Sequence, residues 1–493
     1  MNPLLLGIDI GTSSCKVALF EPDGTVIAQE NGEYSVFYPK PGWAEQDPDD
    51  WWGAVCAATK TLLEKSGVDP KRIAGVGIDG QSWSAIPVDK DGKCLCSTPI
   101  WMDTRAGGVC KELDANIGAD KIFEICGNPL QPAYTLPKIL WYKRERPEIY
   151  ENADKILSAN GYIAYRLAGA VTQDISQAYG YHCFDMRKGK WDEALCAEAG
   201  LRRSLLPEIV PCHQIIGSVT AEASVQCGLA AGTPVVAGGL DAACGTLGAG
   251  VIHNGETQEQ GGQAGGMSIC IDSYCADPRL ILGYHVVPDK WLLQGGTVGG
   301  GGVMRWLQSE LWPDFDIKEL DQEAAVISPG SDGLVFLPYM AGERSPIWDA
   351  KAKGVYYGLD YSKTRGHMIR AGLEGAAFSL RHNLETAERA GAKVMRLRAM
   401  GGAANSRLWT QIKSDLTGKP IDVPASDTAT TLGAAILAGV AAGVYKDFDD
   451  AVMRTVTVTR IHEPNPENKK AYDKTYATYL ELYKNLKSTM QKG

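Results

Sequence analysis

Asp241 is the carboxylate best placed for chemistry in this sequence of 493 residues. It follows a β-branched run, Val235–Val236, and two glycines, and it precedes a run of small residues. This pattern predicts a buried strand, a tight turn and a closely packed helix. Open α/β sheets bind ligands at such a strand-to-helix turn. Two roles stay open for Asp241: a helix N-cap contributing about 1 kcal/mol, or a general base that accepts a hydroxyl proton during phosphoryl transfer from ATP.

Three glycine-bearing turns also follow predicted strands, at 9–14, 261–266 and 401–405. Their backbone amides and hydroxyls suit phosphate oxygens, although the sequence has no Gly-x-x-x-x-Gly-Lys-Ser/Thr motif. Asp9 in the first turn would repel phosphate unless a cation lies between them, so Asp9 and Asp241 are candidate ligands for Mg²⁺. The alternative for Asp9 is a β-hairpin in which its carboxylate bonds only local amides.

Composition narrows the function classes. The net charge is -10 without a basic run, which argues against nucleic acid or an anionic membrane surface as partner. The thirteen cysteines form no Cys-x-x-Cys pair and the seven histidines are isolated, so no metal-ligand spacing is recognisable. No signal peptide is apparent, and the longest small apolar run, 432–444, is too short to span a bilayer. We expect a cytoplasmic protein with reduced thiols.

The elements that must position these residues repeat along the chain. Residues 4–20 predict strand, turn and strand, and Asp47-Pro48 predicts the start of a helix. A strand followed by a glycine turn occurs at 72–80 and again at 394–403. These patterns predict an α/β protein of two similar domains with a cleft between them. Tyrosines spaced three and four residues apart from Tyr472 onward predict a packing stripe on a final helix.

Several segments, in this order, resemble the FGGY family of carbohydrate kinases, and among its members the xylulokinases. Taken together they cover roughly residues 4–440 and are specific as a set. The matching segments are 4–20, Pro39–Trp52, Trp101–Arg105, Thr135–Trp141, Gly342–Pro346, Gly354–Glu374 and Gly401–Ser406.

The resemblance implies two ribonuclease H-like domains of the actin-like ATPase type, here 1–247 and 248–493, with ATP and a sugar in the cleft. It implies Asp241 as the base and Asp9 as the residue that places Mg²⁺. It also implies a set of nucleotide and sugar contacts. The nucleotide contacts are Gly11, Thr12, Ser13, Lys16, Gly262, Gln263, Gly265, Gly401, Gly402 and Ala403, and the sugar contacts are Ser82 and Trp83 with Asp241.

Two departures from the family pattern bear on the substrate. The second phosphate turn usually reads Gly-Thr-Ser-Gly, whereas this chain has Gly262-Gln263-Ala264-Gly265 and so lacks two hydroxyls. Phosphate contact there must come from amides or from Gln263. Ser82-Trp83 replaces the Met-His pair of xylulokinases; Trp83 either stacks on an apolar sugar face or packs as a core indole.

Three further side chains have two interpretations each, and two more have one. Asp103 and Arg105 contact sugar hydroxyls, or they form a structural ion pair near a strand end. Gln81 orients substrate, or it bonds backbone. For Glu343 and Arg344, which lie beside a proline in a loop, we expect a structural role.

Two hypotheses of different classes follow. The first is an enzyme that phosphorylates a sugar hydroxyl with Mg-ATP, with the 5-hydroxyl of D-xylulose as the expected acceptor and another ketose, a polyol or an aldonate as alternatives. The second is a non-catalytic sugar or nucleotide sensor on the same scaffold, because the second turn lacks hydroxyls. A homodimer is one assembly that the sequence leaves open.

Overall fold

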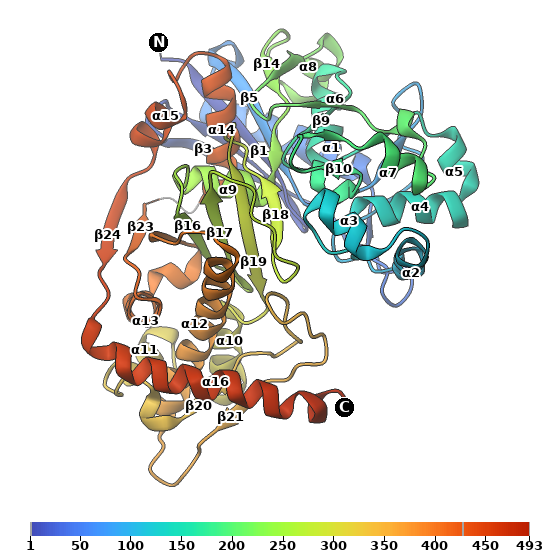
Figure 1. The fold of residues 1–493 in the computed structure, drawn as a ribbon. Coiled ribbons are helices and arrows are strands. Elements are labelled where there is room, and N and C mark those ends of the chain that lie inside the picture. The colour runs from blue at the N-terminus through green and yellow to red at the C-terminus, as the bar shows by residue number, and fades with distance from the viewer. Residues whose placement is uncertain (1, 426–427, 493) are drawn as a thin grey trace.

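The computed structural model describes residues 2–425 and 428–492, and within them two mixed sheets of seven strands each form the centres of two α/β domains (Figure 1). In the first sheet, β1, β2 and β3 form an antiparallel meander, and β5 and β14 extend it in parallel with β1. The strands of this sheet are β1 (Leu4–Ile10), β2 (Ser14–Phe20), β3 (Val26–Glu33), β5 (Ile73–Gly80), β13 (Ile215–Ser218), β14 (Pro234–Val236) and β15 (Gly239–Leu240).

The second sheet repeats this plan. Strands β16, β17, β19 and β18 run antiparallel in turn, while β22 and β23 continue the sheet in parallel with β16. Thus β22 occupies the place that β5 has in the first sheet, and the predicted equivalence of the two strand-turn segments is confirmed. Its strands are β16 (Glu256–Gly261), β17 (Gly265–Ile271), β18 (Ile281–Tyr284), β19 (Trp291–Thr297), β22 (Arg396–Met400), β23 (Ile421–Pro424) and β24 (Val458–His462).

Helices cover both sheets. Helix α1 (Pro48–Ser66) packs against β2 and β3, and it begins as expected, because the Asp47 carboxylate accepts the Asp49 N–H at 2.9 Å. A group of helices lies on the side of the first domain, and most of them enclose a core rich in aromatic side chains. These helices are α2 (Gly107–Asn116), α3 (Ala119–Cys126), α4 (Thr135–Glu145), α5 (Pro147–Asn152), α6 (Ala159–Ala168), α7 (Glu193–Glu198) and α8 (Ala221–Cys227).

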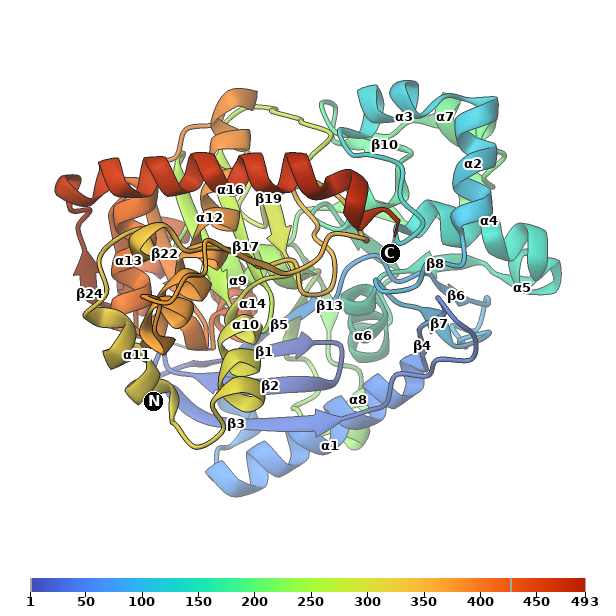
Figure 2. The ribbon, with the colours of Figure 1, turned by 90° about the horizontal axis from the view of Figure 1, so that it is seen from below.

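In the second domain the long helix α12 (Arg365–Ala390) crosses the sheet, and α16 (Lys469–Met490) runs along the outside of the domain (Figure 2). The tyrosine stripe of α16 is buried at Tyr472, Tyr476 and Tyr479, which confirms that prediction. The other helices here are α10 (Gly301–Trp306), α11 (Ile317–Ala325), α13 (Arg407–Thr417) and α15 (Phe448–Thr455).

Helix α14 (Ala429–Ala441) returns from the second half of the sequence to the first sheet. It packs against β1 and β5 on one side and α9 (Asp241–Gly248) on the other, and in Figure 1 it stands beside the blue strands. Glycines permit this contact: a Cβ atom on Gly77 would lie 1.8 Å from the Ala434 carbonyl oxygen, and one on Gly433 would lie 1.8 Å from that of Cys244. The division of the chain into two domains at residue 247 remains a prediction. Helix α14 comes after this boundary in the sequence but packs against the sheet of the first domain.

None of the helices in residues 2–425 and 428–492 combines the length and apolar character needed to cross a lipid bilayer. The apolar run that the sequence assigned to a buried helix is α14, whose residues from Leu432 to Gly439 are buried.

Candidate active site

Asp241 lies where the sequence places it, at the end of a strand and the start of a helix. Strand β15 pairs in parallel with β5, and α9 begins at Asp241 itself. Leu240 is the N-cap and no side chain caps the helix; the Asp241 Oδ1 atom accepts only the N–H of Ala242, at 2.6 Å. The N-cap interpretation of Asp241 is therefore wrong, and its carboxylate is left to face the interior of the site.

A cavity of about 360 Å³ contains Asp241 and is lined by both domains. The first domain contributes two indoles and a phenol, and the second contributes amides, glycine backbone and one guanidinium. The polar and aromatic lining residues are Ser82, Trp83, Trp101, Tyr179, Asp241, Gln258, Gln260, Gln263, Ser268, Gln294 and Arg344. Indole faces beside amide edges suit a ligand with apolar faces and hydroxyl edges, which is the chemistry of a sugar.

Burial, and after it the negative charge of Asp9, raises the pKa of Asp241 to about 7. Asp9 on β1 and Asp79 on β5 are paired in register, so three carboxylates come together at one edge of the first sheet. Asp79 is fully buried, neither of its carboxylate oxygens has a hydrogen-bond partner, and burial followed by the Asp9 charge raises its pKa well above its usual range. Lys16, the register partner of Asp9 on β2, opposes the rise that burial causes in the pKa of Asp9.

The first glycine turn, 11–13, joins β1 to β2 and is held by side chains from distant segments. The Trp101 indole N–H donates to the Thr12 hydroxyl at 3.0 Å, and the Gln46 amide donates to the Thr12 carbonyl at 2.8 Å. The Tyr34 hydroxyl donates to the Gly11 carbonyl at 2.7 Å. Because an indole N–H occupies a lone pair of the Thr12 hydroxyl, its own proton is free to be donated to a ligand.

The loop that carries Ser82 and Trp83 is fixed by a buried lysine. The Lys138 Nζ atom donates to the Trp83 carbonyl at 3.0 Å and to the Ile100 carbonyl at 2.8 Å, and burial lowers the Lys138 pKa to about 7. Trp83 has φ 62°, an unfavourable backbone conformation for a bulky residue. Its ring stacks on Tyr134 at 4.2 Å between centroids. Trp83 therefore packs in the core, as one of its two interpretations predicts, and it also lines the cavity, while stacking on a sugar face stays a prediction.

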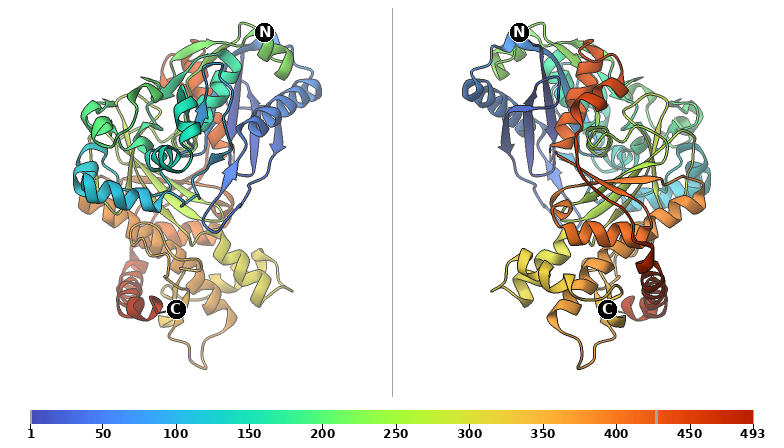
Figure 3. Two further views of the ribbon diagram at one scale, coloured as in Figure 1. Left: turned by 90° about the vertical axis from the view of Figure 1, so that its right-hand side faces the viewer. Right: turned by 90° about the vertical axis from the view of Figure 1, so that its left-hand side faces the viewer.

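A second cavity of about 510 Å³ lies beside the first and shares Gly262 and Gln263 with it. Helices α10 and α11, which project at one end of the molecule (yellow in Figure 3), form one wall. Its lining residues are Gly261, Gly262, Gln263, Gly301, Met304, Arg305, Ile317, Lys318, Asp321, Leu373, Gly402, Ala403, Asn405, Ser406 and Trp409. Its mostly apolar walls and its contact with two glycine turns suit a nucleoside with its phosphates.

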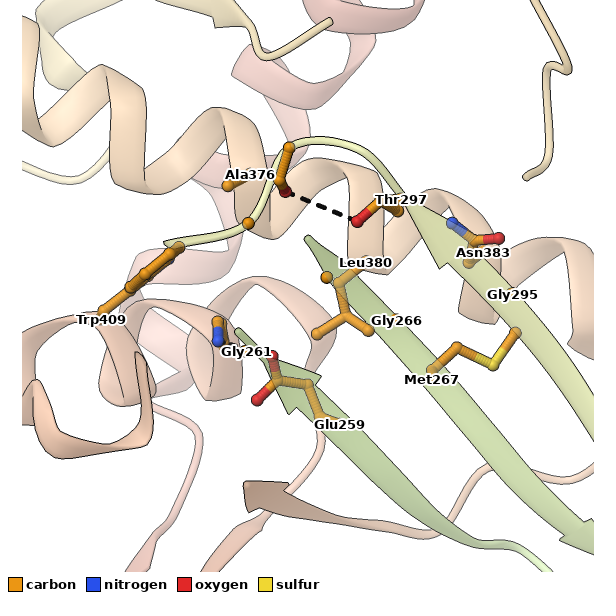
Figure 4. A pocket seen from close by; sticks show the side chains of 14 residues that line it. Glu259, Gly261, Gly266, Met267, Gly295, Thr297, Ala376, Leu380, Asn383 and Trp409 are labelled. Atoms are coloured by element: carbon orange, nitrogen blue, oxygen red, sulfur yellow. Dashed lines mark hydrogen bonds and ion pairs between the residues drawn. The ribbon is translucent and has the colours of Figure 1, made fainter. Parts of the chain in front are cut away.

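A buried ion pair lies beneath the two glycine turns of the second domain. The Lys413 Nζ atom donates to Glu259 at 2.6 Å, and both side chains are 4% exposed. They border a small cavity of about 20 Å³ under Gly261, shown in Figure 4 with Thr297 and Asn383 on its far side. The pair links β16 to α13 and so fixes the spacing of the two turns.

Two family models match this chain: the N-terminal domain of the FGGY family of carbohydrate kinases over residues 4–248, and its C-terminal domain over residues 274–442. The chain belongs to the FGGY family of carbohydrate kinases. A xylulose kinase of Staphylococcus epidermidis is 31% identical over 491 residues, which is 99% of this chain and 98% of that protein. A gluconokinase of Bacillus subtilis is 32% identical over 496 residues, covering 98% and 96%.

The fold agrees with this family. The crystal structure of xylulose kinase from Rhodospirillum rubrum superimposes with a TM-score of 0.93 at 30% identity, covering 99% of this chain and 100% of that one. The actin-like α/β architecture predicted from sequence is confirmed, and the chain is a carbohydrate kinase similar to xylulose kinases. Membership of a sugar kinase family implies ATP as the phosphoryl donor.

Most of the expected site residues of this FGGY kinase lie together. Asp241, Ser82, Trp83, Gly262, Gln263 and Gly265 line the first cavity, and Gly262, Gln263, Gly402 and Ala403 line the second. Asp9, Lys16 and the turn at 11–13 lie at the adjoining end of the first sheet, and Gly401 precedes the turn that borders the second cavity. Within residues 2–425 and 428–492, no cluster of three or more His, Cys, Asp or Glu side chains is arranged to hold a metal ion.

The expected sugar contacts of Asp103, Arg105 and Gln81 need correction. Arg105 donates to Asp103 at 2.7 Å and to Glu45 at 2.6 Å, and its side chain is 2% exposed. It also stacks over Trp43 at 3.7 Å, so the structural ion pair is the interpretation that holds. Gln81 is 1% exposed and bonds Gln46 at 2.8 Å, which makes it a support of the first turn.

Four residues that line or adjoin the cavity were not assigned from the sequence: Asp79, Trp101, Tyr179 and Arg344. Asp79 was recognisable from the sequence only as a carboxylate at the end of a predicted strand. Nothing in the sequence around Trp101 and Tyr179, beyond their being aromatic, indicated that they would line the cavity. Arg344 was expected to be structural, yet its guanidinium reaches the cavity from a loop that follows β20 (Val335–Leu337).

Proposed function

We propose that this kinase transfers the γ-phosphoryl group of Mg-ATP to the 5-hydroxyl of D-xylulose, with Asp241 as general base. One observation carries the proposal: the cavity of Asp241 and the cavity of the nucleoside meet at Gly262 and Gln263. An acceptor beside Asp241 and a nucleotide beside Gly402 then direct a hydroxyl and a phosphoryl group toward the same point. Xylulose kinases are among the relatives that match over nearly the full length, which supports D-xylulose as the acceptor.

The acceptor cavity favours a small polyhydroxylated substrate. Thr246 on α9 donates to Gln258 Oε1 at 2.9 Å, and Gln294 donates to the Ser268 hydroxyl at 3.0 Å, so these amides are held in place before a ligand binds. Trp83 and Trp101 supply flat apolar surface on the opposite wall. A pentulose presents hydroxyl edges and C–H faces that match the two walls.

Asp241 is suited to accept a proton near neutral pH. Its pKa of about 7, caused by burial and by Asp9, lies close to the value at which a base is both deprotonated and able to hold the proton. The Ala242 N–H fixes one carboxylate oxygen and leaves the other for the substrate hydroxyl. In a loose phosphoryl-transfer transition state, positioning and charge neutralisation supply most of the rate.

The carboxylates at the edge of the first sheet fit a magnesium ion. Asp79 is fully buried beside Asp9, and burial raises the pKa of both carboxyl groups, so a bound cation would favour their charged forms. Magnesium in phosphoryl-transfer sites needs only one or two carboxylates, because waters and phosphates complete its shell. When bound, the ion would neutralise charge on the phosphates. Asp9 and Asp241 are the proposed ligands, with Asp79 behind them.

The variant Asp241→Asn tests the proposal. We expect kcat with ATP and D-xylulose to fall about 10²–10⁴-fold, roughly 3–5 kcal/mol of barrier, while the thermal midpoint changes little. Asp272→Asn removes an exposed carboxylate that pairs with Lys290 and serves as the matched control. Turnover of Asp241→Asn within about threefold of wild type would show that Asp241 is not the base.

Gluconokinases match this chain as closely as xylulose kinases, so aldonates are the second class of acceptor. An ADP-release assay with ketoses, polyols and aldonates at equal concentration ranks the acceptors by kcat/KM. We expect D-xylulose to rank first. Stabilisation by a sugar with no ADP release for any member of the panel would identify a sensor in place of an enzyme.

A further inference from the structure

We infer that Arg344 forms an oxyanion-binding site inside the acceptor cavity, which takes either the phosphoryl group in transfer or the carboxylate of an acidic acceptor. This inference rests on the proposed function, because both anions reach the guanidinium only in the cavity of Asp241. Both are flat or trigonal arrays of oxygens that a guanidinium binds through paired N–H bonds.

The first observation is that this guanidinium lacks an anionic partner. Across residues 2–425 and 428–492, no carboxylate lies within ion-pair distance of Arg344, and its side chain makes one long hydrogen bond, from Nη2 to the Thr297 carbonyl at 3.3 Å. A guanidinium has five N–H donors, so most of them remain available to a ligand. Burial lowers the Arg344 pKa, and the charge of Glu343 only partly opposes this, which marks the guanidinium as partly removed from water.

The neighbouring carboxylate does not fill this role. Glu343 Oε1 accepts the backbone N–H of Val298 at 2.6 Å and that of Arg344 at 2.8 Å. Glu343 thus anchors the loop to the end of β19, and its carboxylate forms no ion pair with the guanidinium, although its charge partly compensates that of Arg344. The one acid that adjoins Arg344 in sequence therefore serves its backbone and leaves its side chain free.

The second observation is that the guanidinium is held rigidly against the sheet. It lies over Gly296, where a Cβ atom would stand 3.1 Å from the arginine Cζ and 3.2 Å from Nη2. The Ser345 N–H donates to the Gly296 carbonyl at 3.0 Å, and Asn383 donates to the Ser345 carbonyl at 3.0 Å. Because the loop is fixed on both sides of Arg344, the donors are positioned before any ligand arrives.

The third observation is the chemistry of the second glycine turn. Gly296 is the register partner of Gly266, so the guanidinium lies one strand away from this turn. The turn offers no hydroxyl at Gln263 or Ala264, and the Gln263 amide oxygen is already bound by Arg305. Arg344 therefore supplies on this side of the cavity the hydrogen-bond donors that the turn itself lacks.

The test compares Arg344→Met, which removes the charge and the fork, with Arg344→Lys, which keeps the charge alone. Arg279→Met is the matched control, because Arg279 is exposed and paired with Asp277 at 2.7 Å. Calorimetry measures binding of inorganic phosphate and of D-gluconate to each protein without nucleotide. We expect Arg344→Met to bind one of the two anions at least about tenfold more weakly than wild type, and Arg344→Lys to have an affinity between the two.

The inference is overturned if the affinity of Arg344→Met for each of the two anions falls by less than about tenfold. If Arg344→Met does not fold, wild-type affinity of Arg344→Lys for both anions overturns it instead. Kinetics then identify the source of the anion. A fall in kcat with both D-xylulose and D-gluconate assigns the phosphoryl group, and a rise in KM for D-gluconate alone assigns the carboxylate. If wild type turns over neither acceptor, the proposed function fails while calorimetry still decides the anion site.

Discussion

The two glycine turns that end β1 and β16 occupy the same place in two sheets of the same plan, yet they are stabilised differently. The first turn is held by side chains: Trp101 and Gln46 bind Thr12, and Tyr34 binds Gly11. The second is held by backbone: Gly262 N–H donates to Ala264 at 3.0 Å, and the N–H of Gly301 donates to Gly262 at 2.8 Å. The same fold therefore presents the oriented hydroxyl of Thr12 in the first domain but only backbone amides in the turn of the second domain.

The largest effect is expected beneath the second turn. Lys413→Met leaves Glu259 charged and buried, and we expect the free energy of unfolding to fall by about 3–5 kcal/mol in urea denaturation. Glu259→Gln combined with Lys413→Met removes the stranded charge and should recover part of this loss. No recovery in the double variant would contradict the ion-pair explanation and point to packing around the small cavity instead.

Acid should destabilise both domains, because each contains a histidine that is at most 1% exposed. His182 and His285 are buried, and burial lowers the pKa of each to about 4 from an ordinary 6.5. Between these values the unfolded chain binds the proton and the folded chain does not, so stability is full above pH 6.5 and falls as the pH drops toward 4. Each histidine accounts for about 3 kcal/mol of this fall.

The measurement is the free energy of unfolding of wild type, His182→Gln and His285→Gln between pH 7 and 4. Each variant should lose a similar share of the pH dependence if the domains unfold together. If the unfolding curve shows two transitions and each variant loses pH dependence in only one of them, the two domains unfold separately.

A smaller effect is expected at the first turn. Trp101→Phe keeps a ring in the cavity but removes the N–H that binds Thr12, and we expect kcat to fall about five- to tenfold, near 1 kcal/mol. Trp52→Phe is the matched control, because its indole N–H binds Gln226 at 2.6 Å away from the cavity. If Trp101→Phe costs as much in a Thr12→Ala background as in wild type, the indole does not act through the hydroxyl.

The smallest effect is expected at Gln263. Gln263→Ala frees Arg305 but leaves the backbone frame of the turn intact, so KM for ATP should rise only about two- to threefold. Adding Arg305→Met should then cause little further change. A loss of tenfold or more in kcat would mean that the Gln263 side chain itself replaces the missing hydroxyls.

The local sequence pattern was enough to predict the position of a residue where that position depends only on the segment around it. Asp241 directly follows its strand and two glycines, so its position at the strand end could be predicted. The two strand-turn segments each have a hydrophobic pattern of their own, which predicted their equivalence in the two sheets. The start of α1 at Pro48 and the burial of α14 were predicted for the same reason.

Contacts between distant segments could not be predicted in this way. Whether Arg105 turns toward the cavity or toward Glu45 depends on a segment sixty residues earlier, and whether Arg344 reaches the cavity depends on how its loop docks on β19. Asp79 was recognisable as a strand end, but its proximity to Asp9 follows from register, which periodicity alone does not give.

The packing of α14 between the first sheet and α9 also has a consequence for synthesis. A ribosome that has made the first 248 residues has synthesised every strand of the first sheet and the helix that carries Asp241, but not the helix that covers β1 and β5. That face of the sheet, glycine-lined at Gly77, stays uncovered until residue 441 has emerged. Synthesis of the first domain thus begins the chain but is completed only with α14, and the base gains its final setting when most of the chain exists.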